Sequence, residues 1–315
     1  MTRVAGIDCG TNSIRLLIAD ASDDRSLTDV VREMRIVRLG QDVDRTGRLA
    51  PEAIERTRIA CVEYAGLIEQ HGAERVRMMA TSASRDAENR DDFVAMVRNT
   101  LGVTPEVITG DEEARLSFRG ASGGLPRVAE PILVADLGGG STELVLGSGA
   151  EVVGAYSMDI GSVRMTERHL HDDPPTAAQI EAAAADINAA IDFAAQRVPL
   201  AQARTFVGVA GTITTVAAIA QNLAQYDSTK IHGAVLSART IDEVADRLLH
   251  LTHEERAAIP SLHPGRVDVV GAGALILRTL MRRVGSDELL VSEHDILDGI
   301  TLSTLEQPEE FHEQG

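Results

Sequence analysis

Two stretches of the sequence place an acidic residue beside glycines and hydroxyl groups at the end of an apolar run. The clearer one spans residues 132–146, with the sequence ILVADLGGGSTELVL, in which an apolar segment leads to Asp136 and a turn of three glycines. Glycine allows positive φ and close approach to a ligand, and successive backbone N–H groups in such a turn form a concavity that binds anions. A carboxylate there would repel a bare phosphate. The pattern therefore predicts a phosphate site assisted by a hard cation such as Mg²⁺.

A second copy of this motif occurs near the start of the chain, in residues 4–18, VAGIDCGTNSIRLLI. Three residues of 4–18 align at a constant offset with three residues of 132–146: Asp8 with Asp136, Gly10 with Gly138, and Ser13 with Ser141. One such loop alone would fit a Gly-rich hairpin turn equally well. The repeat instead predicts two similar domains that face each other, each with a phosphate-binding hairpin at one cleft. The copies differ in charge at one aligned position, where residues 4–18 have Arg15 and residues 132–146 have Glu143.

Composition limits the classes of protein to which this chain can belong. The 315 residues, 44% of them hydrophobic, suffice for two globular domains. A formal net charge of −18 disfavours general nucleic-acid binding, which needs a basic footprint. The sequence contains no apolar run of membrane-spanning length and no signal-peptide pattern. With no secretory signal, Cys9 and Cys61 are expected to be reduced thiols, so we expect a cytoplasmic protein.

Strand-like and helix-like segments alternate, which predicts an α/β fold with helices covering the sheets. The small and turn-forming residues at 121–130 predict a boundary between domains 1–125 and 126–315. Strands are expected at 30–39, 76–80, 103–108, 151–158, 205–209 and 289–292, and helices at 84–99, 176–197 and 296–305. A third Gly/Thr turn, Ala210 to Thr215, enters a helix and is another candidate phosphate contact.

Several charged residues outside the hairpins are candidates for the same site. Asp111, Glu112 and Glu113 open a helix, where the dipole favours acids, but capping does not need all three, so one could act as a base in the cleft. Arg85 lies in a first helical turn, where a cation fits if it faces a phosphate or pairs with a neighbouring acid. Lys230 is the one lysine among 30 basic residues and lies in a loop. The histidine spacing does not predict a zinc site.

Taken together, these motifs resemble the acetate kinase, sugar kinase, Hsp70 and actin superfamily, and within it the exopolyphosphatase and guanosine pentaphosphate phosphohydrolase (Ppx/GppA) family. The resemblance extends from Val4 to about Leu305, through five segments: GIDCGTNS at 6–13, ATSASR at 80–85, GDEEAR at 110–115, DLGGGSTE at 136–143 and Gly211-Thr212. It implies two actin-like (ribonuclease H-like) domains, the last helix of which could pack back on the first domain. It also implies a water nucleophile that attacks the terminal phosphoryl group of a phosphoanhydride chain.

The resemblance assigns a role to each candidate residue. Glu113 matches the catalytic base, while Asp136 and Glu143 match acids tied to catalysis and Mg²⁺ (or Mn²⁺), with Asp8 as a further metal-site acid. The positions that bind phosphate in the family match Asn12, Ser13, Arg15, Arg85, Gly138, Gly139, Gly140, Ser141, Gly211 and Thr212. Lys230 is a further candidate for binding phosphate. The segment 291–299 departs from the family pattern, which has Gly at Asp295 and Arg at Leu297, so no role is assigned to it.

The leading hypothesis is an Mg²⁺-dependent exopolyphosphatase that acts on inorganic polyphosphate. Longer family members have further C-terminal domains, so we expect short chains or a nucleotide end as substrate. The alternatives are a guanosine pentaphosphate (pppGpp) phosphohydrolase, a kinase of the wider superfamily, and a non-catalytic polyphosphate or alarmone sensor. No sugar- or carboxylate-specific motif supports a kinase, and a sensor has no use for the base Glu113. The resemblance and the apolar late helices allow a homodimer, although such helices are more often core.

Overall fold

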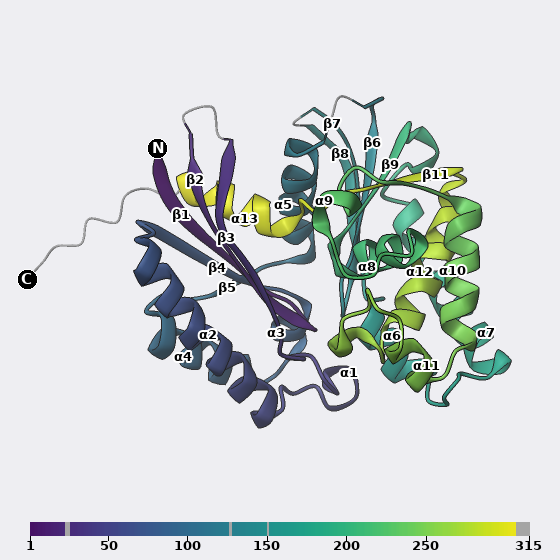
Figure 1. Ribbon diagram of the computed structural model, residues 1–315, viewed down its shortest axis with the longest axis horizontal. Coiled ribbons are helices and arrows are strands. Elements are labelled where there is room, and N and C mark those ends of the chain that lie inside the picture. The colour runs from purple at the N-terminus through teal and green to yellow at the C-terminus, as the bar shows by residue number, and fades with distance from the viewer. Residues whose placement is uncertain (23–25, 126–127, 150, 307–315) are drawn as a thin grey trace, which may run out of the picture.

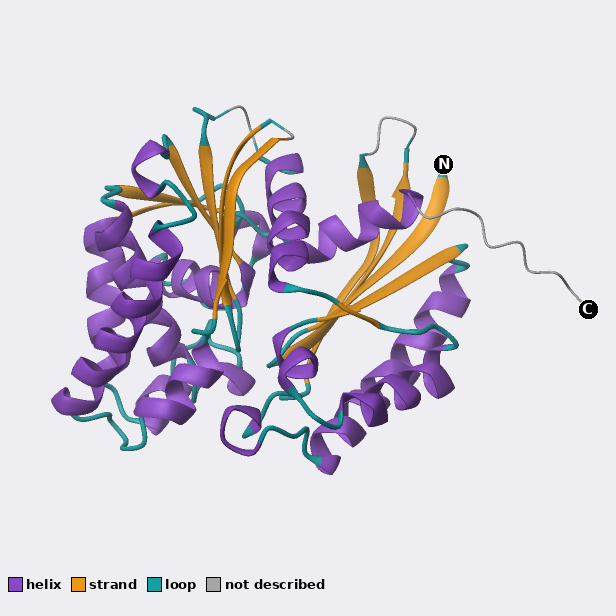
Figure 2. Cartoon of the chain, turned by 180° about the vertical axis from the view of Figure 1, so that it is seen from behind, coloured by secondary structure: helices purple, strands orange, loops and turns teal. Residues whose placement is uncertain are grey.

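The computed structural model describes residues 1–22, 26–125, 128–149 and 151–306. It confirms the α/β class: two mixed sheets face each other, each covered by helices (Figures 1 and 2). The first sheet has the order β3-β2-β1-β4-β5. Its strands are β1 (Thr2–Cys9), β2 (Ser13–Ala21), β3 (Leu27–Ile36), β4 (Arg75–Ala80) and β5 (Glu106–Val107). The expected strand at 30–39 thus lies three residues earlier, and only two residues of the one expected at 103–108 are strand.

The second sheet repeats the plan of the first, with the order β10-β11-β9-β6-β7-β8. Its strands are β6 (Ile132–Leu137), β7 (Thr142–Ser148), β8 (Glu151–Met158), β9 (Thr205–Val209), β10 (Val235–Ser237) and β11 (Glu288–Val291). In the first sheet, β1, which carries Asp8, is antiparallel to β2 and parallel to β4. In the second sheet, β6, which carries Asp136, is antiparallel to β7 and parallel to β9. The short sequence repeat therefore marks a repeat of the whole sheet.

Helices pack on the outer face of each sheet and form its core. The first sheet is covered by α2 (Pro51–His71) and α4 (Arg90–Leu101), and Pro51 stands at the first helical turn, where its missing N–H costs nothing. The second core is larger and contains α7 (Ala177–Ala195), α8 (Ala210–Ala220), α10 (Ala238–His250) and α12 (Val270–Val284). The apolar face of α12 is buried in this core, so it gives no support to the expected homodimer.

Two helices cross between the domains, so the domains are not simply residues 1–125 and 126–315 as predicted. Helix α5 (Gly110–Gly123) packs on β6, β7 and β8 of the second sheet, where Ala114 and Phe118 contact Val134 and Val145. Helix α13 (Ile296–Ser303) returns to pack on β1, β2 and α5 (Figure 1). Each sheet thus borrows a helix from the other half of the sequence. The expected boundary itself adjoins residues 126–127, which lie outside the described residues.

The helix expected at 84–99 is interrupted. The turn after β4 forms α3 (Ser82–Asp86), which begins after Thr81 rather than Ser84, and α4 starts afresh at Arg90. Four further short helices are α1 (Val43–Thr46), α6 (Ser162–His169), α9 (Ser228–Ile231) and α11 (His253–Ala257). Within the described ranges, no helix is both long enough and apolar enough to cross a membrane.

Candidate active site

A cavity of about 520 Å³ lies between the two domains. Both Gly-rich hairpins and the N-terminus of α8 line it, as do the acids Asp8, Glu113, Asp136, Glu293 and Asp295. The repeated motif and the third Gly/Thr turn therefore converge on one space, although they lie far apart in the sequence.

The two hairpins are built alike. In the first, the N–H of Gly10 donates to the carbonyl of Ser13 at 2.9 Å; in the second, the N–H of Gly138 donates to the carbonyl of Ser141 at 3.0 Å. The strand register places Arg15 directly opposite Asp8. It places Glu143 directly opposite Asp136 in the same way. Directly opposite residues of an antiparallel pair have Cβ atoms roughly 4.5–5.5 Å apart, so each pair of side chains interacts.

The carbonyl groups of both turns accept hydrogen bonds from the protein, whereas several of their N–H groups have no acceptor in the described ranges. In the second hairpin, the carbonyls of Gly138 and Gly139 accept from the backbone N–H groups of Ser162 and Val163 at 3.0 and 2.8 Å. Within the described chain, the N–H groups of residues 139–141 have no hydrogen-bond acceptor. The first hairpin is similar, because the Asn12 carbonyl accepts from the N–H groups of residues 37 and 38, and the N–H groups of residues 11 and 12 have no acceptor in the described ranges. Free N–H groups beside a cavity form an anion-binding surface.

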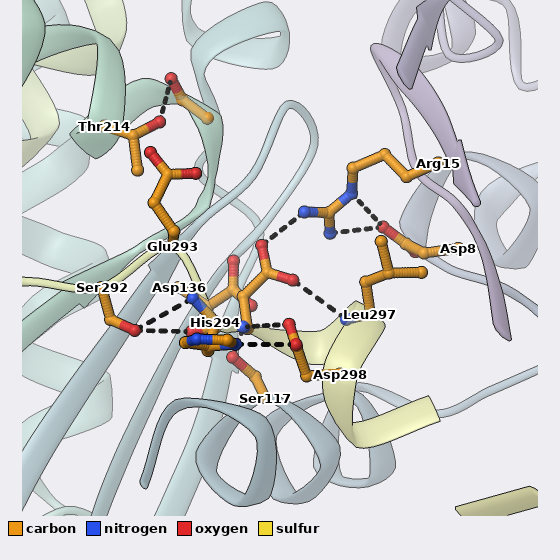
Figure 3. Close-up of polar contacts among 12 residues, drawn as sticks. Asp8, Arg15, Ser117, Asp136, Thr214, Ser292, Glu293, His294, Leu297 and Asp298 are labelled. Carbon is orange, nitrogen blue, oxygen red and sulfur yellow. Dashed lines mark hydrogen bonds and ion pairs between the residues drawn. The ribbon is translucent and has the colours of Figure 1, made fainter. Parts of the chain in front are cut away.

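In the first hairpin the acid is neutralised by arginine. The guanidinium of Arg15 donates to Asp8 Oδ2 from Nη2 at 2.6 Å and from Nε at 3.0 Å, and it also bonds Asp295 (Figure 3). Burial raises the pKa of Asp8, while the charge of Arg15 opposes this increase. Arg15, expected to cradle phosphate, is therefore already engaged by two carboxylates.

In the second hairpin the opposing residues are both acids. Asp136 accepts from Ser117 Oγ at 2.5 Å (Figure 3), and Glu143 accepts from Ser157 Oγ at 2.7 Å. Burial, followed by the negative charge of Asp295, raises the pKa of Asp136 to about 7. Burial likewise raises the pKa of Glu143 well above its usual range, and the charges of Glu113 and Asp136 add to this. Two buried carboxylates without a counter-cation hold protons until a cation neutralises them.

Glu113 faces the cavity from α5. Thr109 caps this helix by accepting from the N–H of Glu112 at 3.2 Å, and the helical phase leaves Glu112 exposed and Glu113 buried. The guanidinium of Arg85 donates to Glu113 Oε2 at 3.1 Å and to the carbonyl of Ile108 at 3.0 Å. Burial raises the pKa of Glu113 to about 8, since the opposing effect of Arg85 is smaller. A buried carboxyl group with this pKa has the properties of a general base near neutral pH.

The third wall of the cavity is the start of α8, where Gly211 and Thr212 lie. A Cβ atom at residue 211 would stand only 1.8 Å from Arg266 Nη1, so glycine is needed for this close approach. The preceding residue, Ala210, has φ of 70°, which is strained for a residue with a side chain and is typical of functional turns. Arg266 makes no ion pair with any acid in the described ranges, and its positive charge is available to an anion in the cavity.

The structure brings most predicted site residues together but not all of them. Apart from Lys230, three of them are not part of the cavity wall itself: Glu143 and Arg85 lie directly behind it, against wall residues, and a Cβ atom at Gly140 would meet Ser82 and Thr11. Lys230 is the exception, because its side chain is 63% exposed on α9 and pairs with Asp227 three residues away at 3.0 Å. The prediction that Lys230 binds substrate is therefore not supported by its position. A Lys and an Asp spaced by one helical turn form an ordinary surface pair.

Four residues at the site were not singled out from the sequence as part of it: Ser117, Arg164, Arg266 and Asp295. Ser117 follows Glu113 by one helical turn, so the helical period of α5 could have indicated it. Arg266 and Asp295 come from distant loops, and no local pattern marks them. Asp295, which departs from the family pattern, proves to be a direct partner of Arg15.

The oxygen atoms that the two hairpins present to the cavity suit a hard cation. Within the described residues, no group of three or more Asp, Glu, His or Cys side chains is arranged to hold a metal ion. Mg²⁺ is, however, normally bound by one or two carboxylates, with waters and substrate phosphates completing its shell. Asp8 Oδ1 and Asn12 Oδ1 are buried in the cavity wall without a hydrogen-bond partner, so oxygen ligands are available there. The residues present therefore fit Mg²⁺ shared with a phosphate.

Comparison with known proteins agrees with this geometry. Residues 17–308 match the model of the Ppx/GppA phosphatase family. Exopolyphosphatase 2 of Mycobacterium tuberculosis (strain H37Rv) is 55% identical, over 96% of this chain and 98% of its own. A bifunctional 3-dehydroquinate synthase/phosphatase of Fusobacterium nucleatum is 35% identical over 96% of this chain, which matches 46% of that longer protein.

Solved structures show the same fold. The crystal structure of an exopolyphosphatase-like protein superposes with a TM-score of 0.94 at 49% identity, covering 96% of this chain and 97% of that one. An exopolyphosphatase from Cytophaga hutchinsonii superposes with a TM-score of 0.86 at 26% identity, covering 97% of this chain and 98% of that one. The chain is therefore a hydrolase that belongs to the Ppx/GppA phosphatase family.

Proposed function

We propose that this protein is an exopolyphosphatase, which removes the terminal phosphate of inorganic polyphosphate with water activated by Glu113. The observation that carries this proposal is the pair of opposed hairpins, whose free N–H groups flank a cavity with a buried base between them. Phosphoryl transfer depends mainly on positioning and charge neutralisation, and both are provided for here. The 55% identity to a protein named exopolyphosphatase 2 supports the choice of substrate.

The activity is expected to require Mg²⁺, with Mn²⁺ as a substitute that accepts the same oxygen ligands. Asp136 and Glu143 would hold the ion, with the unpartnered oxygen of Asp8 as a further ligand. When bound, the ion supplies neutralisation of the phosphate oxygens. The protein's own residues do the rest: the hairpin N–H groups bind phosphates, Arg85 orients the Glu113 carboxylate, and Glu113 accepts a proton from water.

Guanosine pentaphosphate is the second candidate substrate, favoured by the part of the cavity beyond the hairpins. Arg266, which makes no ion pair in the described ranges, lines the cavity near Tyr226, and Met34 and Leu262 line the same cavity. Apolar and aromatic side chains beside a free cation would suit a nucleoside attached to phosphates. Short polyphosphates also fit the proposal, because the candidate phosphate contacts surround one cavity of about 520 Å³ between the two domains.

The test is release of inorganic phosphate with Mg²⁺ from tripolyphosphate, long-chain polyphosphate, guanosine pentaphosphate and ATP. Glu113→Gln should reduce turnover on the order of 100-fold or more while substrate still binds, since a positioned base contributes about 10²–10⁴-fold. Glu112→Gln is the matched control, because this neighbouring acid is exposed and should stay within about twofold of wild type.

The substrate panel separates the candidates. Fastest release from tripolyphosphate supports a short-chain exopolyphosphatase, and a clear preference for guanosine pentaphosphate supports the second candidate. If wild type and Glu113→Gln bind polyphosphate equally but neither releases phosphate, the protein is a sensor and the proposal is wrong.

A further inference from the structure

Arg164 of α6 joins the second hairpin to the opposite domain. Its Nε donates to the carbonyl of Gly140 at 2.7 Å, Nη1 pairs with Asp44 of α1 at 2.6 Å, and Nη2 pairs with Asp86 of α3 at 2.5 Å. The side chain is only 12% exposed. One planar guanidinium thus connects three elements, two of which belong to the first domain, and its fork suits such bidentate contacts.

The surrounding contacts show that Arg164 belongs to a group of residues that joins α6 to α1 across the cleft. Both helices lie away from the crossing helices α5 and α13 (Figure 1). The backbone N–H of Asp42 donates to Glu167 at 3.1 Å, and Arg168 pairs with Asp44 at 3.1 Å. These neighbours also join α1 to α6, but neither of them touches a hairpin. Arg164 alone among the three bonds both the opposite domain and the phosphate-binding turn.

Holding the Gly140 carbonyl has a direct consequence for the phosphate site. The C=O of Gly140 and the N–H of Ser141 belong to one planar trans peptide and point in opposite directions. A carbonyl drawn toward Arg164 therefore turns the Ser141 N–H away from Arg164; Ser141 lines the cavity, whereas Arg164 does not. Gly161 permits this arrangement, since a Cβ atom there would lie 2.4 Å from the Gly139 backbone.

We propose that Arg164 is a positioning residue that links closure of the cleft to the orientation of the phosphate-binding hairpin. In the closed arrangement, Asp44 and Asp86 hold the guanidinium where its Nε meets Gly140. When the domains separate, these two acids leave, the guanidinium is free to turn, and the Gly140–Ser141 peptide loses its anchor. The inference rests on the proposed phosphohydrolase function, since it gives the hairpin its role in binding substrate.

The experiment compares three variants by kinetics and by an independent measure of closure. Arg164→Gln removes both connections, whereas Asp44→Asn/Asp86→Asn removes only the ion pairs to the first domain. Arg45→Gln is the matched control, because this exposed arginine of α1 pairs with Asp42 of its own helix. Closure is followed as the distance between spin labels on cysteines introduced at Glu52 and Glu254, both exposed; the native Cys9 and Cys61 are buried and should not be labelled.

Arg164→Gln should lower kcat for polyphosphate on the order of 10- to 100-fold, because small displacements of positioning groups have effects of this size. The double variant should mainly raise KM, by a few-fold, and both should lengthen the label distance relative to Arg45→Gln. Equal kinetic effects of Arg164→Gln and the double variant would overturn the link to the hairpin, and an unchanged distance in both would overturn the link to closure. The distance is measured without turnover, so it tests the bridge even if the protein hydrolyses none of the substrates.

Discussion

The two hairpins share one backbone plan and differ in charge at one position. Each has an Asp at the end of its first strand, the same internal N–H to C=O bond, and free N–H groups at its turn. Opposite the Asp stands Arg15 in the first hairpin and Glu143 in the second. The pair in the first hairpin thus combines an acid with a base, whereas the pair in the second hairpin consists of two acids. The same backbone geometry thus occurs twice, and we expect the single cross-strand residue to decide which of the two hairpins attracts a cation.

The neighbourhood of each hairpin reinforces this difference. Arg15 also bonds Asp295, so both acids at the first hairpin have an arginine of the protein as partner. Around the second, Glu113 and Asp136 have pKa values raised to about 8 and about 7, and Glu143 is also raised. Arg85 pairs with Glu113, but Asp136 and Glu143 have no arginine partner in the described ranges. Buried carboxylates without such a partner are costly unless they are protonated or bound to a metal ion. This comparison is the reason why we propose that the metal ion and the base act at the second hairpin.

The largest effect is expected when the second hairpin is given the charge of the first. Glu143→Arg places a resident cation opposite Asp136, which should displace Mg²⁺ and reduce phosphate release on the order of 10³-fold or more, as loss of a key electrostatic contact does. Glu143→Gln removes the metal ligand without adding a cation and should also be severely impaired. Activity is measured across a range of Mg²⁺ concentrations.

Glu143→Gln should be more stable than wild type although it is less active. A gain in the free energy of unfolding would show that the loss of activity does not come from misfolding. Because the folded-state pKa of Glu143 is raised, folding favours its protonated form, and wild type loses stability as pH rises above the unfolded-state pKa. Glutamine avoids that loss, so urea unfolding without metal should show a gain of roughly 1–3 kcal/mol at pH 8 and almost none at pH 4. An inactive variant that is also less stable at pH 8 would contradict the carboxylate-pair interpretation.

The next effect concerns the first hairpin, where Arg15→Gln removes the cation shared by Asp8 and Asp295. Both acids are more than nine-tenths buried, so loss of their partner should destabilise the protein by about 2–4 kcal/mol at pH 7. Urea unfolding measures this change. Adding Asp295→Asn should restore part of the loss, since one of the two unpaired charges is then removed. If the single variant is as stable as wild type, Arg15 is not the resident cation of this hairpin.

The smallest expected effect is a pH dependence that reports the base. Glu113 must be ionised to accept a proton, and its pKa is raised to about 8 by burial. At low Mg²⁺, kcat/KM should therefore rise about tenfold per pH unit up to about pH 8 and then level off. High Mg²⁺ should shift this rise to lower pH, since a nearby cation favours the ionised carboxylate. A flat profile between pH 6 and 8 would argue against Glu113 as the base.

The sequence alone determined the local parts of this protein. The Asp-x-Gly turns between apolar runs predicted both hairpins, because strand period and glycine conformation act within a few residues. The alternation of elements predicted an α/β fold for similar reasons. The acids 111–113 were expected to open a helix with one turned inward, and Glu113 is the one that the structure buries.

Only the tertiary structure decided which residues meet across the cleft. The crossing of α5 and α13 brings Asp295 to Arg15, and the packing of α6 against α1 brings Arg164 to Asp44 and Asp86. Arg266 reaches Gly211 from a segment distant in the sequence. Lys230, singled out by its rarity, remains at the surface. Such contacts depend on how two whole sheets pack against each other. That packing is set by the sum of many buried apolar contacts, and no short stretch of sequence encodes it.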